Sequence, residues 1–298
     1  MTFGISGNLD KEELPLVVEQ LLSRFEREKI QYVLHDAVAR AVKPLLRSLK
    51  IKRSCLVPEQ KLGTSCDMLI SLGGDGTILR YARLLAATKT PILGINLGKL
   101  GFLAEVSLDE LNECLDEILR NQYVIEPRMM LESYGNSMKA KFTALNDIVV
   151  SKYGASRVMD IETYVNGEFL ATFTGDGIII STPTGSTAYA LANGGPIVTP
   201  KNRSITISPI CPHTLTARPV IVPDDSVIVL KVLSTVSGIQ LSGDGQQEKQ
   251  LSSPAKITVQ KAPFDARLVK RKRTSYYEVL RRKLHWATDV RVRNGESS

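Results

Sequence analysis

The spacing of apolar residues changes character near Pro127 of the 298-residue chain. Before that point, compact apolar runs alternate with segments in which apolar residues recur at helical spacing. A compact run such as 68–72 is typical of a strand that is buried on both faces of a sheet. Strands separated by helices predict a parallel α/β domain. We expect strands at 3–6, 32–34, 68–72 and 91–95, and helices at 14–25, 78–87 and 107–119, the last opening with a capping box of Ser107 and Glu110.

Between Pro127 and about Pro263 the chain consists of short apolar runs that are separated by turn residues, with little helical spacing. Two of these runs flank Asn166-Gly167, a dipeptide that strongly favours a tight hairpin. Many short strands with regular turn signals predict an all-β domain, which we expect to be an antiparallel sandwich. The strands expected with most support are 161–165, 168–173, 227–233, 239–242 and 256–259.

Helical spacing returns near the C-terminus. Ser275 and Glu278 form a second capping box, and Tyr277, Leu280 and Leu284 recur on one face of the predicted helix. That face is expected to pack on another element, since an apolar stripe on a helix needs a partner. We therefore predict an α/β domain at 1–126, a β-rich domain at 127–263, and a C-terminal segment, 264–298, that returns to the first domain.

The composition is that of a globular protein. Hydrophobic residues make up 43% of the chain and charged residues 23%, which allows a sizeable core and excludes a disordered chain. The long uncharged stretch 177–200 contains Pro183 and Pro196, so it does not suit a membrane-spanning helix. The N-terminal residues lack a basic region followed by an apolar block, and we expect a cytoplasmic protein without a secretory signal. Four cysteines without a C-x-x-C pair, and three scattered histidines, favour reduced thiols over structural zinc.

The formal net charge is +7, and part of the excess lies in two basic runs, 270–273 and 281–283. Such runs are compatible with nucleic-acid binding or with a solvated tail on a protein that handles anionic substrates. We favour the solvated tail, because no recognisable nucleic-acid module accompanies the charge. Neither a nucleic acid nor a membrane is therefore expected among the partners.

The strongest chemical feature is a turn between a strand and a helix, Gly73-Gly74-Asp75-Gly76-Thr77. Glycines let the backbone approach a polyphosphate closely, and the N-terminus of the following helix offers free N–H groups to it. The turn is neither a G-x-x-x-x-G-K-[ST] loop nor a G-x-G-x-x-G loop. A carboxylate beside bound phosphate is electrostatically unfavourable, so we expect Asp75 to accept a proton or to hold a metal ion.

A second feature follows Gly175-Asp176-Gly177 and comprises the stretch from Ser181 to Pro196. It is rich in small hydroxyl groups, glycines and exposed backbone, and Tyr189 is its one aromatic ring. Hydroxyl and amide groups suit the edges of a base and a ribose, and the ring suits the face of a base. This stretch therefore predicts a nucleotide-binding segment in the β-rich domain.

These motifs resemble those of the NAD kinase family. The turn resembles their G-G-D-G-T signature, but diacylglycerol kinases, sphingosine kinases and, more distantly, phosphofructokinases have similar G-G-D-G sequences. The string from Gly175 to Tyr189, in contrast, is similar to the NAD-binding core of NAD kinases. Three shorter segments resemble further family elements: Asn146-Asp147, Gly98-Lys99-Leu100-Gly101-Phe102-Leu103 and Gly243-Asp244-Gly245-Gln246. The resemblance covers 71–246 and a C-terminal segment at 276–284. Asp147 departs from the pattern, since many members carry glutamate there.

The resemblance implies a Rossmann-like first domain and transfer of the γ-phosphoryl group of ATP to the adenosine-ribose 2′-hydroxyl of NAD. Asp75 would be the general base or the group that positions this hydroxyl. The donor phosphates would pass over Gly73, Gly74, Gly76 and Thr77. The residues implied for NAD binding are Asp75, Gly76, Arg80, Asn146, Asp147, Arg157, Asp176, Thr187, Ala188, Tyr189, Ala190, Leu191, Ala192 and Gln246.

The resemblance also implies Mg²⁺ or another divalent cation, held mainly by nucleotide phosphates and water rather than by protein ligands. A homodimer or homotetramer is implied as well, and the sequence leaves open whether polyphosphate replaces ATP as donor. Two other functions compete with this hypothesis. A lipid kinase would share the glycine-rich turn but would need an apolar pocket or a membrane-facing surface. A non-catalytic NAD(P) sensor would not need a carboxylate in an intact G-G-D-G-T turn.

Overall fold

The computed structural model describes residues 1–43, 51–98, 101–135, 138, 141–154, 158–233, 238–273 and 275–286. The chain divides into two compact units. Unit 1 comprises Met1–Ile78, Thr90–Glu126 and the segment that starts at Leu268, and unit 2 comprises Leu79–Lys89 and Pro127–Arg267. The α/β domain and the antiparallel β domain expected from the sequence are both present, and each unit is described by itself below.

The elements of the first 122 residues are β1 (Thr2–Gly7), α1 (Leu14–Glu28), β2 (Gln31–His35), α2 (Asp36–Val42), η1 (Arg53–Cys55), β3 (Leu56–Val57), η2 (Glu59–Lys61), α3 (Leu62–Ser65), β4 (Met68–Gly73), α4 (Asp75–Leu85), η3 (Ala86–Thr88), β5 (Ile92–Asn96) and α5 (Leu111–Leu119). The following elements are β6 (Tyr123–Gly135), β7 (Phe142–Ala144), β8 (Asp147–Lys152), β9 (Met159–Val165), β10 (Glu168–Gly175), β11 (Gly177–Ser181), η4 (Thr184–Thr187), α6 (Tyr189–Ala192), β12 (Ser204–Ile210), β13 (Val220–Pro223), β14 (Ile228–Val232), β15 (Ile239–Gly243), β16 (Gln247–Leu251), β17 (Ala255–Arg271) and α7 (Tyr276–Leu284).

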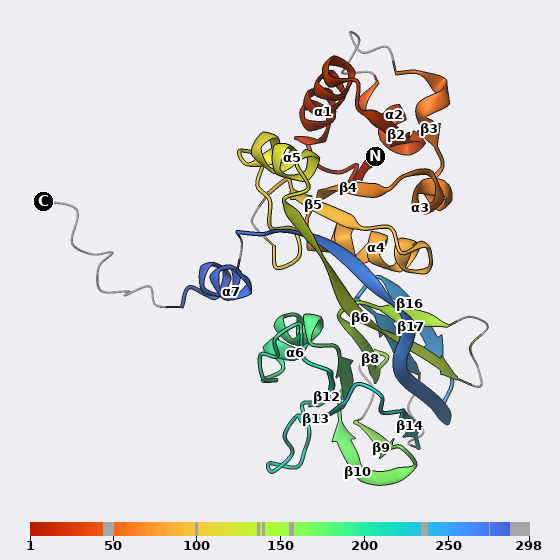
Figure 1. Ribbon diagram of the computed structural model, residues 1–298. Coiled ribbons are helices and arrows are strands. Elements are labelled where there is room, and N and C mark those ends of the chain that lie inside the picture. Colours follow the sequence, from red (N-terminus) through yellow and green to blue (C-terminus); the bar gives the residue numbers. More distant parts are fainter. Residues whose placement is uncertain are drawn as a thin grey trace, which may run out of the picture. The chain divides into compact units, whose positions relative to one another are not determined.

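Unit 1 is built on a parallel sheet with the strand order β5-β4-β1-β2-β3 (Figure 1). The last part of β17 lies beside β5, where Leu268 pairs in parallel with Ile92. From β1 the chain continues to β2 on one side, and from β4 it continues to β5 on the other. The order therefore reverses between β1 and β4, and open α/β sheets bind ligands outside the carboxyl ends of the strands at such a point.

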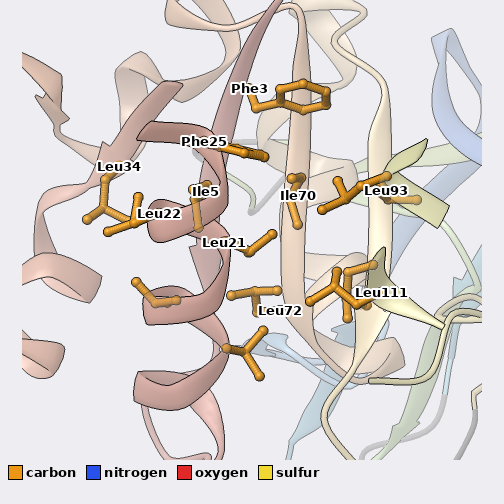
Figure 2. Close-up of a cluster of buried hydrophobic side chains, with 14 of the residues drawn as sticks. Phe3, Ile5, Leu21, Leu22, Phe25, Leu34, Ile70, Leu72, Leu93 and Leu111 are labelled. Atoms are coloured by element: carbon orange, nitrogen blue, oxygen red, sulfur yellow. The ribbon is translucent and has the colours of Figure 1, made fainter. Parts of the chain in front are cut away.

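One face of this sheet carries a core of alternate strand residues. Ile5 of β1 and Ile70 of β4 point to the same side as the apolar stripe of α1, which includes Leu21 and Phe25 (Figure 2). Helices α2 and α5 contribute to the same core. The other face is covered by the first turn of α4, since a Cβ at Gly94 would lie 2.3 Å from Cδ1 of Ile78. Since both faces of β4 are covered, all six of its residues are buried, as the apolar run predicted.

Unit 2 is an antiparallel sandwich. One sheet has the order β13-β12-β11-β8-β15-β16, and the other contains the neighbouring strands β10-β9-β14-β17. Inward-facing residues of the two sheets form one core, to which Val150 and Ile180 contribute from the first sheet and Ile161 and Leu230 from the second. The hairpin expected at Asn166-Gly167 joins β9 to β10, and both residues have the positive φ that this turn requires (52° and 86°).

Three local expectations need correction. Helix α4 begins at Asp75 rather than at Ile78, so the aspartate lies in its first turn. Ser107 and Glu110 form only half of a capping box: Ser107 donates its N–H (3.2 Å) and its hydroxyl (2.9 Å) to Glu110 Oε2, and the pair closes a turn that precedes α5, which starts at Leu111. Ser275 caps α7 as expected, whereas Tyr277 is exposed and the buried residues of that helix are Val279 and Leu280.

The first half of the first basic run is a buried strand end rather than part of a solvated tail, whereas Lys272 and Arg273 are exposed as expected. Lys270 and Arg271 belong to β17 and are 7% and 6% exposed. The sequence pattern missed this, because four consecutive cations are typical of a solvated segment. Lys270 donates to Glu105, and the Arg271 side chain donates to acidic residues of α5 and the preceding turn. The acidic partners of Arg271 are Glu110 (3.0 Å), Glu113 (3.2 Å) and Glu117 (2.6 Å).

Replacing Arg271 by alanine is expected to lower the free energy of unfolding by about 2–4 kcal/mol, because it removes the buried cation of the little-exposed Glu117 carboxylate and leaves it only the more distant, half-exposed Arg273. The matched control is Arg273→Ala, at a position that is half exposed and pairs with the same helix, and it is expected to change stability far less. Urea unfolding followed by circular dichroism measures both changes in the free energy of unfolding. Equal losses in the two variants would contradict the assignment.

The same ion pair predicts a dependence of stability on pH. The hydrogen bond from Arg271 lowers the pKa of Glu117 from its usual 4.5. The stabilisation by this pair is therefore present above pH 4.5 and is lost as the pH falls through the lowered pKa.

Candidate active site

The Gly73-Gly74-Asp75-Gly76-Thr77 turn lies at the carboxyl end of β4, where the strand order of unit 1 reverses. A Cβ at Gly73 would approach Oγ1 of Thr77 to 2.2 Å, so the strand enters the helix with no room for a side chain. Gly74 has no neighbouring atom within 4 Å of its Cβ position, so its backbone is open to an approaching group. An open glycine before a helix N-terminus is the arrangement that binds phosphate in α/β folds.

The carboxylate of Asp75 is held by a separate loop. Its Oδ2 accepts the N–H of Phe102 (2.8 Å), and its Oδ1 accepts the N–H groups of Leu103 and Ala104 (3.0 Å each). A Cβ at Gly101 would lie 1.8 Å from Oδ1, so only glycine lets the loop come this close. The 101–104 loop thus fixes the orientation of the candidate catalytic group, and its first three residues belong to a motif that the sequence connected with the family only by its pattern.

In unit 2, Asn146 lies between β7 and β8 and Asp147 begins β8, and a carboxylate again holds the backbone. Asp244 accepts three N–H groups: those of Leu145 (3.0 Å) through Oδ2, and of Asn146 (2.7 Å) and Asp147 (3.2 Å) through Oδ1. The guanidinium of Arg83 donates to Asp244 Oδ2 over 3.1 Å. The side chain of Asp244 is fully buried and that of Arg83 is 12% exposed.

The two acidic side chains at this place influence each other. Burial, together with the negative charge of Asp244, raises the pKa of Asp147 from 3.8 to about 7. Burial also raises the pKa of Asp244, but the three N–H groups and Arg83 act against this shift. Arg83 therefore favours charge on Asp244, and Asp147 is the member of the pair that takes up a proton near neutral pH.

The hydroxyl-rich stretch that follows β11 packs against the same turn. Thr182 donates its N–H to the Asn146 carbonyl (2.8 Å) and its hydroxyl to the Leu145 carbonyl (2.6 Å). A Cβ at Gly185 would lie 2.1 Å from the Asn146 oxygen, which makes glycine necessary there. Ser186 uses its hydroxyl to join Pro183 to Val198. Several of the hydroxyls that suggested ligand binding therefore hold the loop together.

The remaining residues expected to bind NAD are distributed as follows. Thr187 ends η4, and 188–192 lead into and form the short helix α6, with Tyr189 47% exposed. Asp176 precedes β11 and pairs with Lys152, whose Nζ lies 2.7 Å from Oδ1. Gln246 accepts a hydrogen bond from Arg83 (2.5 Å). Arg80 is exposed on α4, and Arg157 lies outside the described residues.

The structure thus brings Asn146, Asp147 and Gln246 together around Arg83 and Asp244, within unit 2. Neither Arg83 nor Gly101 was expected as a site residue from the sequence. Arg83 lies two turns after the glycine-rich motif on the same helix, which was a weak signal because arginines are common on helix surfaces. Gly101 lies in the motif that starts at Gly98, and only its closeness to Asp75 shows why it is glycine.

The described residues contain no group of three or more His, Cys, Asp or Glu side chains that could hold a metal ion. Among the helices in the described part of the chain, none has the length and apolarity needed to cross a membrane.

The sequence matches two domain families. Residues 4–123 match the ATP-NAD kinase N-terminal domain, and residues 145–271 match the ATP-NAD kinase C-terminal domain. Among curated relatives, an NAD kinase of Desulforamulus reducens is 37% identical over 95% of this chain and 96% of its own. An NAD kinase of Geobacter metallireducens is 43% identical over 77% of this chain and 82% of its own.

Solved structures give the same result. The yeast NADH kinase complexed with NADH superposes with a TM-score of 0.87 at 27% identity, covering 97% of this chain and 89% of that chain. An NAD kinase from Archaeoglobus fulgidus in complex with ATP gives a TM-score of 0.73 at 25% identity, covering 96% of this chain and 99% of that chain. With both domain families matched in order and with relatives similar over most of their length, the chain belongs to the ATP-NAD kinase family.

Proposed function

We propose that this chain is an NAD kinase that transfers the γ-phosphoryl group of ATP to the 2′-hydroxyl of the adenosine ribose of NAD, giving NADP. The observation that carries the proposal is the Asp75 carboxylate, which stands in the first turn of α4 beside an open glycine backbone and is oriented by three N–H groups. A binding protein without catalysis has no evident use for such a carboxylate. Family membership supports the same substrates, since relatives are NAD kinases and two similar structures contain NADH and ATP.

In the proposed reaction Asp75 orients the 2′-hydroxyl and accepts its proton as the new O–P bond forms, while the bond from the γ-phosphorus to ADP breaks. A carboxylate is a weak base for an alcohol. In a loose phosphoryl-transfer transition state, however, little proton transfer is needed early, and orientation contributes most. The backbone of Gly73, Gly74, Gly76 and Thr77 is proposed to receive the donor phosphates at the N-terminus of α4.

Residues of unit 2 are proposed to bind NAD. Asn146, Asp147 and Asp176 would hold ribose hydroxyls or the carboxamide, and the 187–192 segment would hold the adenosine, with the exposed ring of Tyr189 available for stacking. Gln246 and Arg157 are proposed to assist, and Arg80 to contact phosphate or ribose. These roles follow from the resemblance and from the exposure of the segment at α6.

Mg²⁺ or another divalent cation is proposed to enter with ATP. Both oxygens of Asp75 already accept backbone N–H groups, which suits a positioning role better than a metal ligand. Phosphate oxygens and water would then supply the coordination, as Mg²⁺ prefers. When bound, the ion neutralises charge on the transferring phosphates. A homodimer or homotetramer in the cytoplasm, without nucleic-acid or membrane partners, is proposed on the family resemblance.

The assay that tests the function measures NADP after incubation of the purified chain with NAD, Mg²⁺ and one donor at a time. ATP, another nucleoside triphosphate and polyphosphate are compared, and NADP formation with ATP is expected. Binding of NAD without any NADP formation would instead make the chain a sensor, and labelling of a lipid alcohol in vesicles would make it a lipid kinase.

Asp75→Asn is expected to lower kcat by roughly 10²- to 10⁴-fold, which is the usual contribution of a general base. The amide keeps the size of the side chain, so NAD should still bind, and its Kd can be measured by calorimetry. Turnover near that of the unchanged protein would remove Asp75 from the mechanism.

Gly101→Ala is expected to reduce kcat as well, without touching any substrate. Its methyl group would lie 1.8 Å from Asp75 Oδ1, so the loop or the carboxylate must move. The matched control is Gly98→Ala, whose Cβ would meet only Lys11 Nζ at 3.6 Å and which should leave kcat nearly unchanged. Equal activities of the two variants would show that the 101–104 loop does not orient Asp75.

The KM for NAD is expected to rise as the pH falls below about 7, because the carboxylate form of Asp147 accepts hydroxyl hydrogen bonds and its pKa is raised to about 7. Below that value the ionised fraction falls about tenfold per pH unit. Asp147→Asn, which carries no charge at any pH, should flatten this dependence. Initial rates at pH 5.5 to 8.5 test it, and an unchanged slope in the variant would assign the effect to another group.

A further inference from the structure

The Asp244-Gly245 pair forms the tight turn of the β15–β16 hairpin. Both residues have positive φ (53° and 62°), and Gln246 donates its N–H to the Gly243 carbonyl over 3.0 Å. This is the geometry of a hairpin turn for which Asp-Gly is a preferred dipeptide. Asparagine or glycine would serve such a turn as well, so turn formation alone does not account for the aspartate.

The Asp244 carboxylate is directed at the segment between β7 and β8. Its two oxygens accept the consecutive N–H groups of Leu145, Asn146 and Asp147. In return, the N–H of Asp244 donates to the Asp147 carbonyl over 3.0 Å. One residue therefore makes four hydrogen bonds to three consecutive residues, and the backbone that carries Asn146 and Asp147 has little freedom to rotate.

Arg83 stabilises the buried charge that this arrangement needs. Its Nη1 donates to Asp244 and its Nη2 to Gln246, so the planar guanidinium joins two positions of the hairpin end. A fully buried carboxylate without a cation would be strongly destabilised. The side chains of Asp244 and Arg83 are 0% and 12% exposed, which leaves little surface for direct contact with a ligand.

The opposite side of the same segment is held by the hydroxyl-rich loop. Thr182 donates to the carbonyls of Leu145 and Asn146, and Gly185 packs against Asn146 with no space for a methyl group. The N–H groups of the segment and the Asp147 carbonyl thus bond to Asp244, and the carbonyls of Leu145 and Asn146 bond to Thr182. Because the backbone is held on both sides, the directions in which the side chains of Asn146 and Asp147 leave it are fixed as well.

We propose that Asp244, with Arg83 as its counter-ion, is a positioning residue that sets the side-chain geometry of Asn146 and Asp147 for NAD. The proposal rests on the proposed function, in which those two side chains bind the nucleotide. Hydrogen bonds to ribose hydroxyls depend steeply on distance and angle, so a displaced backbone weakens NAD binding. A displacement of about 1 Å is enough for a 10²-fold effect.

The test measures KM for NAD, KM for ATP, kcat and thermal midpoint for Asp244→Asn and Arg83→Met in the full chain. Replacing a carboxylate oxygen by an amide leaves at least one N–H of the segment without an acceptor. KM for NAD is expected to rise roughly 10- to 100-fold in both variants, with KM for ATP changed by less than about twofold. Arg83→Lys keeps the positive charge and should recover part of the loss.

The double variant Asp244→Asn/Arg83→Met provides a second criterion. Since both residues act through one segment, its KM for NAD should resemble that of the worse single variant instead of reaching the product of the two effects. If Asp244→Asn folds poorly, the comparison of Arg83→Met with Arg83→Lys still tests the proposal, because only the second keeps a cation beside Asp244.

The matched control is Asp224→Asn. Asp224 is also a buried carboxylate of unit 2, with a side chain 7% exposed and with Lys261 Nζ at 2.6 Å and Arg203 Nε at 3.4 Å. Its loss should lower the thermal midpoint as much as that of Asp244 while KM for NAD stays unchanged. An unchanged KM in Asp244→Asn, or equal rises in KM for NAD and ATP, would overturn the proposal. Absence of NADP formation by the unchanged chain would instead overturn the proposed function.

Discussion

The acceptance of consecutive backbone N–H groups by one carboxylate is the interaction on which the candidate site depends. It is found in both units: Asp75 holds the 102–104 loop, and Asp244 holds the 145–147 segment. Hydrogen bonds to an ionised acceptor are stronger than those between neutral groups. Each carboxylate therefore fixes the backbone of a short segment that lies outside the helices. Without these hydrogen bonds, the segment would be free to sample several conformations.

The two carboxylates differ in exposure and so in what they are suited to do. Asp244 is fully buried with a cation beside it, which suits a permanent structural partner of the backbone. Asp75 is only partly buried and stands just beyond the carboxyl end of β4, where it remains accessible to solvent. The same hydrogen-bonding pattern thus supports the backbone at Asp244 and orients the candidate catalytic carboxylate at Asp75.

The sequence allowed the two-domain fold, most strands and the chemically important segments to be predicted, because these depend on local spacing and on turn residues. The six buried residues of β4 and the Asn166-Gly167 hairpin are examples. Contacts between segments that are far apart in the sequence could not be predicted in this way. Nothing in the spacing of Arg83 and Asp244 indicates that residues 161 positions apart form an ion pair. Likewise, the hydroxyls of Thr182 and Ser186 suggested a ligand until their backbone partners were known.

The basic run at the end of β17 shows how formal charge can mislead in the same way. Lys270 and Arg271 are neutralised within the fold by Glu105, Glu110 and Glu117, at distances far shorter than the screening length of physiological salt. Seen from outside the protein, these cations and anions largely cancel. Long-range attraction of polyanionic nucleotides must therefore come from the exposed arginines and lysines elsewhere. The part of the surface that sets the encounter rate with substrate is thus not revealed by a count of charges along the sequence.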